Sequence, residues 1–180
     1  DGTIVSSGLS KWCGAGGWRL GFFAIPDKLK DLKNSLKVLC SESFTSVSAP
    51  IQYAAVKAYT EDYSNYLEKV KKILFSTGMY VYENLKSNTI NVSKPEGGFY
   101  LFPEFLNANF SSSAEMCKDI LLKTGVALLP GSDFGIDSKR MIARLSYTDF
   151  DGENFLKNTS GSKSLDADDL KKYAPNIVDG

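Results

Sequence analysis

The chain has 180 residues, of which 43% are hydrophobic and 12% aromatic, and its 21 basic and 21 acidic residues cancel to a formal net charge of zero. This composition is that of a globular protein with a sizeable core, in one large domain or two small ones. No segment is strongly basic, so we expect no nucleic-acid partner, because phosphate binding needs a concentrated positive face. No apolar run approaches the roughly 18 residues of a membrane span, so we expect no membrane partner.

The chain contains three cysteines and no histidine. An odd number of cysteines without CxxC spacing disfavours a disulfide scaffold and favours a reducing compartment, so we expect a cytoplasmic protein. Without histidine, the chain alone cannot build a Ser-His-Asp or Cys-His nucleophile, and three scattered cysteines are poor zinc ligands. We therefore expect no metal, and chemistry that rests on Lys, Arg, Asp, Glu, Tyr or Cys.

The first third of the chain predicts one strand and two helices. In order, the expected elements are a buried strand at 18–25, a helix at about 28–40, a polar loop at 41–49 and a short helix at about 50–59. Asp27 is expected to cap the first helix, in which leucines recur at helical spacing.

A long helix is predicted from 61 to about 87, with Gly78 as a weak point inside it. The elements expected after it are a strand at 99–102, an amphipathic helix at 111–123, a strand and turn at 126–131, a strand at 141–147, a polar loop at 151–164 and a last helix at about 166–174. Ser112 or Ser113 is expected to cap the amphipathic helix, and Gly125 to end it. The pattern indicates an α/β first part, a long connecting helix and a smaller α+β part.

Two cations near the start are candidates for binding chemistry. Lys11 lies among small and apolar residues, which removes it partly from water and favours the neutral amine needed for imine formation. Arg19, eight residues later, carries a fixed fork suited to a phosphate, and the glycines between them let both groups converge on one small molecule. From spacing alone, a surface lysine on a flexible loop and an arginine in an ordinary ion pair remain the alternative.

The glycine cluster matches neither nucleotide-binding motif. A P-loop requires GxxxxGK[ST], whereas Lys11 is preceded by serine and followed by tryptophan. A GxGxxG fingerprint that begins at Gly14 requires a glycine where Arg19 stands.

Residues 8–21, GLSKWCGAGGWRLG, resemble the attachment signature for pyridoxal phosphate (PLP) of class I/II aminotransferases, in which Lys, Arg and the closing Gly are fixed at these separations. Further blocks occur in the family's order: GGFY at 97–100, LPGSDFG at 129–135 and RLSY at 144–147. The resemblance therefore extends over nearly the whole chain.

This resemblance implies a role for three residues. Lys11 holds PLP as a Schiff base and moves the substrate's Cα proton, Arg19 binds the cofactor phosphate, and Arg144 receives the substrate's α-carboxylate as a bidentate pair. A structural salt bridge is the alternative for Arg144, since an arginine in a strand is costly without an anionic partner. Phe99 and Tyr100 are expected to line the cleft or to pack in the core.

The sequence departs from the family at three points. The acid that pairs with the pyridine nitrogen, a tyrosine near the 3-hydroxyl and a ring-stacking aromatic lie upstream of the lysine in family members, so the chain alone is expected to be an inactive C-terminal fragment. Gly8 stands where many members place a phosphate-binding serine, with Ser7 or Ser10 as possible substitutes. No arginine lies between Arg19 and Arg140, which disfavours the dicarboxylate recognition of one aspartate aminotransferase subgroup.

The resemblance implies an α/β fold, the C-terminal portion of a fold type I PLP-dependent transferase. Residues 1–60 are expected to end the large PLP-binding domain, 61–88 to form a connecting helix and 89–180 to form the small domain. The implied reaction moves an amino group between an α-amino acid and a 2-oxo acid in a homodimer. A PLP-dependent lyase or synthase, a non-catalytic ligand-sensing domain and a structural module without cofactor are the alternatives.

Overall fold

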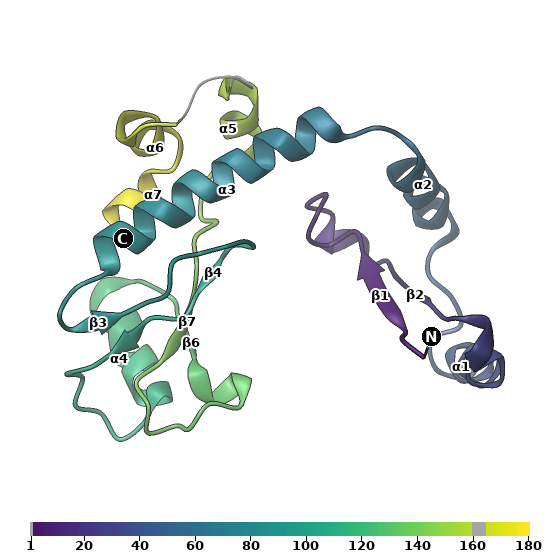
Figure 1. The fold of residues 1–180 in the computed structure, drawn as a ribbon, viewed down its shortest axis with the longest axis horizontal. Coiled ribbons are helices and arrows are strands. Elements are labelled where there is room, and N and C mark those ends of the chain that lie inside the picture. The colour runs from purple at the N-terminus through teal and green to yellow at the C-terminus, as the bar shows by residue number, and fades with distance from the viewer. Residues whose placement is uncertain (1, 160–164) are drawn as a thin grey trace. The chain divides into compact units, whose positions relative to one another are not determined.

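The computed structural model describes residues 2–159 and 165–180 and divides the chain into two compact units, Asp1–Tyr63 and Ser64–Gly180. Figure 1 shows the elements of both units, each of which is described by itself. In the described ranges, no helix is long and apolar enough to cross a membrane.

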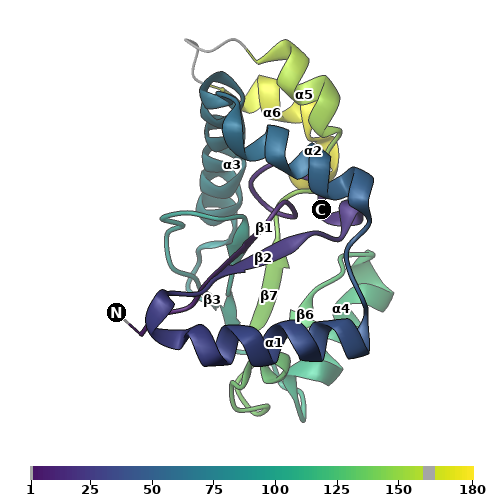
Figure 2. The ribbon, with the colours of Figure 1, turned by 90° about the vertical axis from the view of Figure 1, so that its right-hand side faces the viewer.

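The first unit is built on an antiparallel hairpin. Strand β1 (Val5–Gly8) pairs with β2 (Gly21–Ala24) in a register that places Gly8 opposite Gly21. Two 3₁₀ turns and two helices complete the unit: η1 (Gly16–Trp18), η2 (Asp27–Leu29), α1 (Lys30–Ser43) and α2 (Ala49–Thr60). The view in Figure 2 looks onto the hairpin and α1.

Three expectations for this unit were wrong in detail. The strand is shorter than predicted and is not buried, since Phe22 is 42% and Phe23 67% exposed on a two-stranded ribbon. Asp27 does not cap α1: it lies in η2, and the helix begins at Lys30 with no side-chain cap. The helix also continues to Ser43 into the predicted loop, where the Ser43 hydroxyl donates a hydrogen bond to the Leu39 carbonyl.

Aromatic rings join the loop of the hairpin to the end of α2. The Trp12 ring lies 5.6 Å from that of Tyr59 and 6.2 Å from that of Tyr63, and Phe22 meets Tyr59 edge-on at 5.4 Å. These contacts hold the segment that follows Lys11 against a helix.

The second unit is organised around the long helix α3 (Ser64–Leu85). Three short helices, α5 (Gly152–Asn158), α6 (Ala167–Tyr173) and α7 (Pro175–Asp179), follow each other near it, and α5 and α7 contact it (Figure 1 and Figure 2). An antiparallel sheet of order β4-β7-β6 consists of β4 (Tyr100–Leu101), β7 (Ala143–Ser146) and β6 (Leu129–Pro130). The remaining elements are the pair β3 (Ile90–Asn91) and β5 (Glu104–Phe105), the helix α4 (Ser113–Thr124) and the 3₁₀ turn η3 (Gly131–Phe134).

The predicted loop at 151–164 was wrong over its first half. Asp151 caps α5 by accepting a hydrogen bond from the backbone N–H of Asn154, and Phe155 is fully buried against Ile73 of α3. Two adjacent apolar residues, Phe155 and Leu156, in a polar stretch gave no periodic signal, although the burial of Phe155 secures the helix. Residues 160–164 lie outside the described residues. The last predicted helix does end before Pro175, but a further helix, α7, begins there.

Both predicted ends of α4 are confirmed. Ser112 is the N-cap and accepts a hydrogen bond from the Glu115 backbone N–H at 3.2 Å. The Glu115 carboxylate in turn accepts from the Ser111 N–H, and hydrogen bonds from Ser111 lower the pKa of Glu115. Gly125 ends the helix in the left-handed conformation, with φ of 79°.

Gly78 is a contact point rather than a weak point of α3. It is buried, and a β-carbon at this position would lie 2.8 Å from Cζ of Tyr147, whose ring is 1% exposed. The absence of a side chain thus lets Tyr147, the residue that follows β7, pack directly on the helix.

We expect Gly78→Ala to lower the melting temperature of the protein. Alanine gains roughly 1 kcal/mol of helix propensity over glycine, but overpacking against a buried ring costs about 1–3 kcal/mol. Thermal unfolding measures the net effect, with Ser76→Ala on the same helix as the control. A Gly78→Ala protein that melts above the wild type would contradict the packing described.

Candidate active site

Lys11 lies at the closed end of the hairpin. Beyond the paired glycines, the Leu9 N–H donates to the Leu20 carbonyl at 3.2 Å, and the Ala15 N–H donates to the Leu9 carbonyl at 3.1 Å. Leu9 is 2% exposed, so it anchors the loop, whereas Lys11 two residues later is exposed. The expected removal of Lys11 from water is therefore not found in this unit.

Arg19 is on the same loop, at its return to β2. Its backbone is in the left-handed region with φ of 54°, and its Nη1 donates to the Gly16 carbonyl at 2.8 Å. Non-glycine residues seldom adopt this conformation, which costs about 1–2 kcal/mol. Lys11 and Arg19 thus both belong to the loop that closes the hairpin, and both residues are exposed.

Gly8 has a steric reason for being glycine. A β-carbon on it would lie 2.9 Å from the Leu20 carbonyl oxygen and 3.3 Å from Cα of Gly21, both of which are backbone atoms. A serine at this position would therefore force the two strands apart. Ser10 lies instead beside Gly16, the residue whose carbonyl accepts the hydrogen bond from Arg19.

Two variants of Arg19 separate its backbone from its side chain. Arg19→Gly and Arg19→Lys both remove the guanidinium, but only glycine relieves the left-handed conformation. We expect the glycine variant to be more stable than the lysine variant by about 1 kcal/mol. Chemical denaturation of the two variants measures the difference, and equal or reversed stabilities would show that the strain is absent.

Arg144 belongs to the second unit, in the central strand β7. Its guanidinium carbon lies 4.3 Å from the centre of the Tyr100 ring and 4.6 Å from the centre of the Phe134 ring. Among the described residues no carboxylate pairs with it. Arg140 is different, because it forms a bidentate pair with Glu104 at 3.0 and 2.9 Å. The structural salt bridge considered for Arg144 is thus not seen in the described part of the chain.

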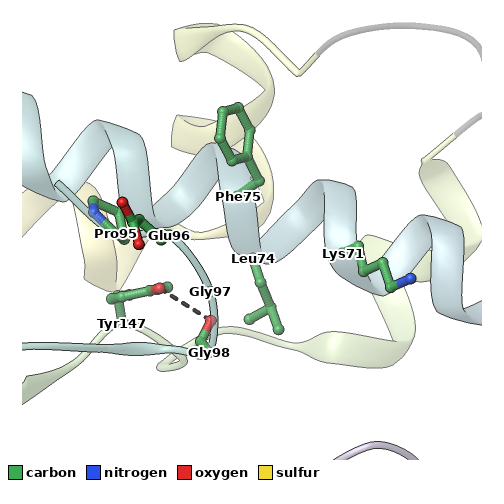
Figure 3. Close-up of a pocket in the computed structure, with 8 residues that line it drawn as sticks. All are labelled: Lys71, Leu74, Phe75, Pro95, Glu96, Gly97, Gly98 and Tyr147. Atoms are coloured by element: carbon green, nitrogen blue, oxygen red, sulfur yellow. Dashed lines mark hydrogen bonds between the residues drawn. The ribbon is translucent and has the colours of Figure 1, made fainter.

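Tyr147 positions the strand that carries Tyr100. Its hydroxyl donates to the Gly98 carbonyl at 3.1 Å, and its N–H donates to the Phe99 carbonyl at 3.3 Å. Figure 3 shows the hydrogen bond between the Tyr147 hydroxyl and the Gly98 carbonyl. It lies beside a pocket of about 250 Å³ between α3 and the turn at Gly97 and Gly98. Burial raises the pKa of the Tyr147 phenol, so the hydroxyl stays a donor at neutral pH.

Sequence reasoning did not assign roles to Phe134, Phe102 or Tyr147. The alternation of residues along β7 could have indicated which residues of this strand share a face with Arg144. The residues of other strands that contact Arg144 depend on the pairing of β4 and β6 with β7. Strand pairing of this kind is not visible in two-residue strands.

Known proteins resemble the chain in sequence and in structure. The profile of the family "Aminotransferase class I and II" matches residues 1–155. A probable N-acetyl-LL-diaminopimelate aminotransferase of Bacillus subtilis is 35% identical over 150 residues, which cover 82% of this chain and 36% of that protein. An aspartate aminotransferase of Bacillus sp. strain YM-2 is 34% identical over 150 residues, with 81% and 36% covered.

Solved structures agree. An aromatic aminotransferase from Pyrococcus horikoshii superposes with a TM-score of 0.71 at 29% identity, over 86% of this chain and 40% of that one. An alanine aminotransferase from Pyrococcus furiosus gives a TM-score of 0.71 at 31% identity, over 80% and 37%. The chain belongs to the class I and II aminotransferases, and its fold is that of part of a fold type I enzyme. It spans little more than a third of the length of these relatives.

Enzymes of this class use PLP, and the residues of the hairpin loop fit that group. PLP carries an aldehyde and a phosphate, and the loop presents an amine and a guanidinium at one end of the ribbon. Beside Lys11, the buried indole Nε1 of Trp12 has no hydrogen-bond partner among the described residues. The loop thus carries an amine and a guanidinium, the groups suited to the aldehyde and the phosphate of PLP. It also carries an indole N–H that donates no hydrogen bond to any described residue.

Proposed function

We propose that this chain contributes the cofactor-bearing lysine and the carboxylate-binding arginine of an enzyme that transfers an amino group between an α-amino acid and a 2-oxo acid. The observation that carries this proposal is the hairpin, whose closing loop contains both Lys11 and Arg19.

Lys11, Arg19 and Arg144 have different roles in the proposed reaction. Bound PLP supplies an electron sink that stabilises negative charge on the substrate's Cα. Lys11 holds the cofactor through Nζ and afterwards moves the proton at that Cα. Arg19 binds the phosphate, and Arg144 receives the α-carboxylate in a bidentate pair. Because the Tyr100 and Phe134 rings already lie against the guanidinium, it can receive the carboxylate with little loss of side-chain freedom.

Ser10 is our choice for the hydroxyl that replaces the phosphate-binding serine at Gly8. It lies beside Gly16 on the loop that carries Arg19, whereas Ser7 lies within β1 opposite Phe22. We further propose a homodimer in the cytoplasm, where the three free cysteines stay reduced. Amino-acid and 2-oxo-acid substrates follow from the names of the relatives.

Reductive trapping tests this function in the longest natural polypeptide that contains the chain. After addition of PLP and borohydride, peptide mass spectrometry should find one phosphopyridoxyl group on Lys11, and Lys11→Ala should abolish it. Lys37→Ala, which removes an exposed lysine of α1, is the matched control.

The same preparation tests the reaction. An amino acid should shift the absorbance band of the cofactor near the visible edge, and a 2-oxo acid should restore it. Labelling of other lysines, or none, would overturn the role of Lys11. Labelling of Lys11 with a band that no 2-oxo acid restores would favour a lyase, a synthase or a ligand-sensing domain.

A further inference from the structure

The guanidinium of Arg144 lies beside aromatic and aliphatic side chains on one face of the sheet. Residues paired across an antiparallel ladder share a face, as do residues two apart in one strand. Tyr100 pairs with Ser146, and Leu129 pairs with Arg144, so all four lie on the same side of the sheet. The opposite side carries Leu101 and Ala143, which are buried in the core.

Aromatic side chains extend this face around the guanidinium. Phe134 of η3 lies against Arg144, and Phe102 meets Phe134 edge-on at 5.5 Å. Phe102, Phe134 and Leu129 are each 41–44% exposed although they are large and apolar. A ligand whose carboxylate pairs with Arg144 therefore finds apolar surface next to that carboxylate.

The nearest arginine in the sequence is already engaged. A dicarboxylate needs a second cation for its distal group, but Arg140 is held bidentately by Glu104, and this pairing raises the pKa of its guanidinium. Glu104 of β5 also forms a bridge with Ile142, two residues before Arg144, so the Arg140–Glu104 ion pair lies next to β7 and its two charges neutralise each other. Moving Arg140 toward a ligand would leave the Glu104 carboxylate without this partner.

We propose that the Arg144 face selects monocarboxylate amino acids with an apolar or aromatic side chain over dicarboxylates. This selectivity rests on the proposed function, because it requires Arg144 to receive the α-carboxylate. Phe134 and Phe102 act as specificity-determining residues: Phe134 holds the guanidinium and, with Phe102, supplies apolar contact to the side chain of the ligand.

Carboxylate titration followed by NMR tests the proposal in this chain. Only three arginines occur, Arg19, Arg140 and Arg144, so ¹⁵N-arginine labelling gives three Nε–Hε signals that Arg→Lys variants assign. The probes are 3-phenylpropionate, succinate and acetate. We expect the Arg144 signal to shift saturably, with 3-phenylpropionate binding roughly three- to tenfold more tightly than succinate.

Two variants and a control identify the cause of the preference. Phe102→Ala should weaken 3-phenylpropionate and leave acetate nearly unchanged, whereas Phe134→Ala, which also removes a ring against the guanidinium, should weaken both ligands and 3-phenylpropionate more. Phe75→Ala, which removes an exposed phenylalanine of α3, should change neither.

The outcomes separate the two proposals. Succinate binding as tightly as 3-phenylpropionate, or a preference that survives both variants, would overturn the selectivity and leave Arg144 as a carboxylate ligand. An Arg144 signal that no carboxylate moves would overturn its role in the proposed function.

Discussion

The contact between Tyr147 and Gly78 is the constraint on which the second unit depends. One buried ring lies on the bare backbone of α3, and its hydroxyl holds the glycine turn through the Gly98 carbonyl. The same residue ends the segment that carries Arg144, and its N–H fixes Phe99 next to Tyr100. Helix, turn and strand are thereby joined at one point. Because Tyr147 contacts both the helix and the turn, the position of Arg144, three residues earlier, is tied to the packing of the helix.

The candidate residues of the two units are held in place by different kinds of contact. Lys11 and Arg19 lie in the same loop, between β1 and β2. Their placement depends on local hydrogen bonds and on the left-handed backbone of Arg19. Arg144 depends on a sheet whose strands come from distant parts of the sequence, and on two rings that replace a carboxylate as its neighbours. The N–H groups of an arginine that contacts only aromatic rings can still donate hydrogen bonds to a ligand. Arg140, in contrast, donates hydrogen bonds to the Glu104 carboxylate.

The two ends of α4 could be predicted from the sequence, whereas several features that depend on tertiary contacts could not. Ser112 and Gly125 bound α4 as expected, because a cap depends on the residues beside it. The family resemblance rested on a short motif whose spacing is itself local. The helix α5 was missed because one buried side chain, Phe155, secures it. The exposure of β2 was missed because an apolar run does not reveal what covers it. Phe134 was missed as a neighbour of Arg144 because its place depends on the pairing of β6 with β7.

The most direct measurement is a crystal structure, grown with PLP, of the longest natural polypeptide that contains this chain. The account predicts electron density that is continuous from Nζ of Lys11 into the cofactor, with the phosphate in hydrogen-bond contact with the guanidinium of Arg19. Density for PLP at another lysine, or a phosphate that is bound without Arg19, would contradict it.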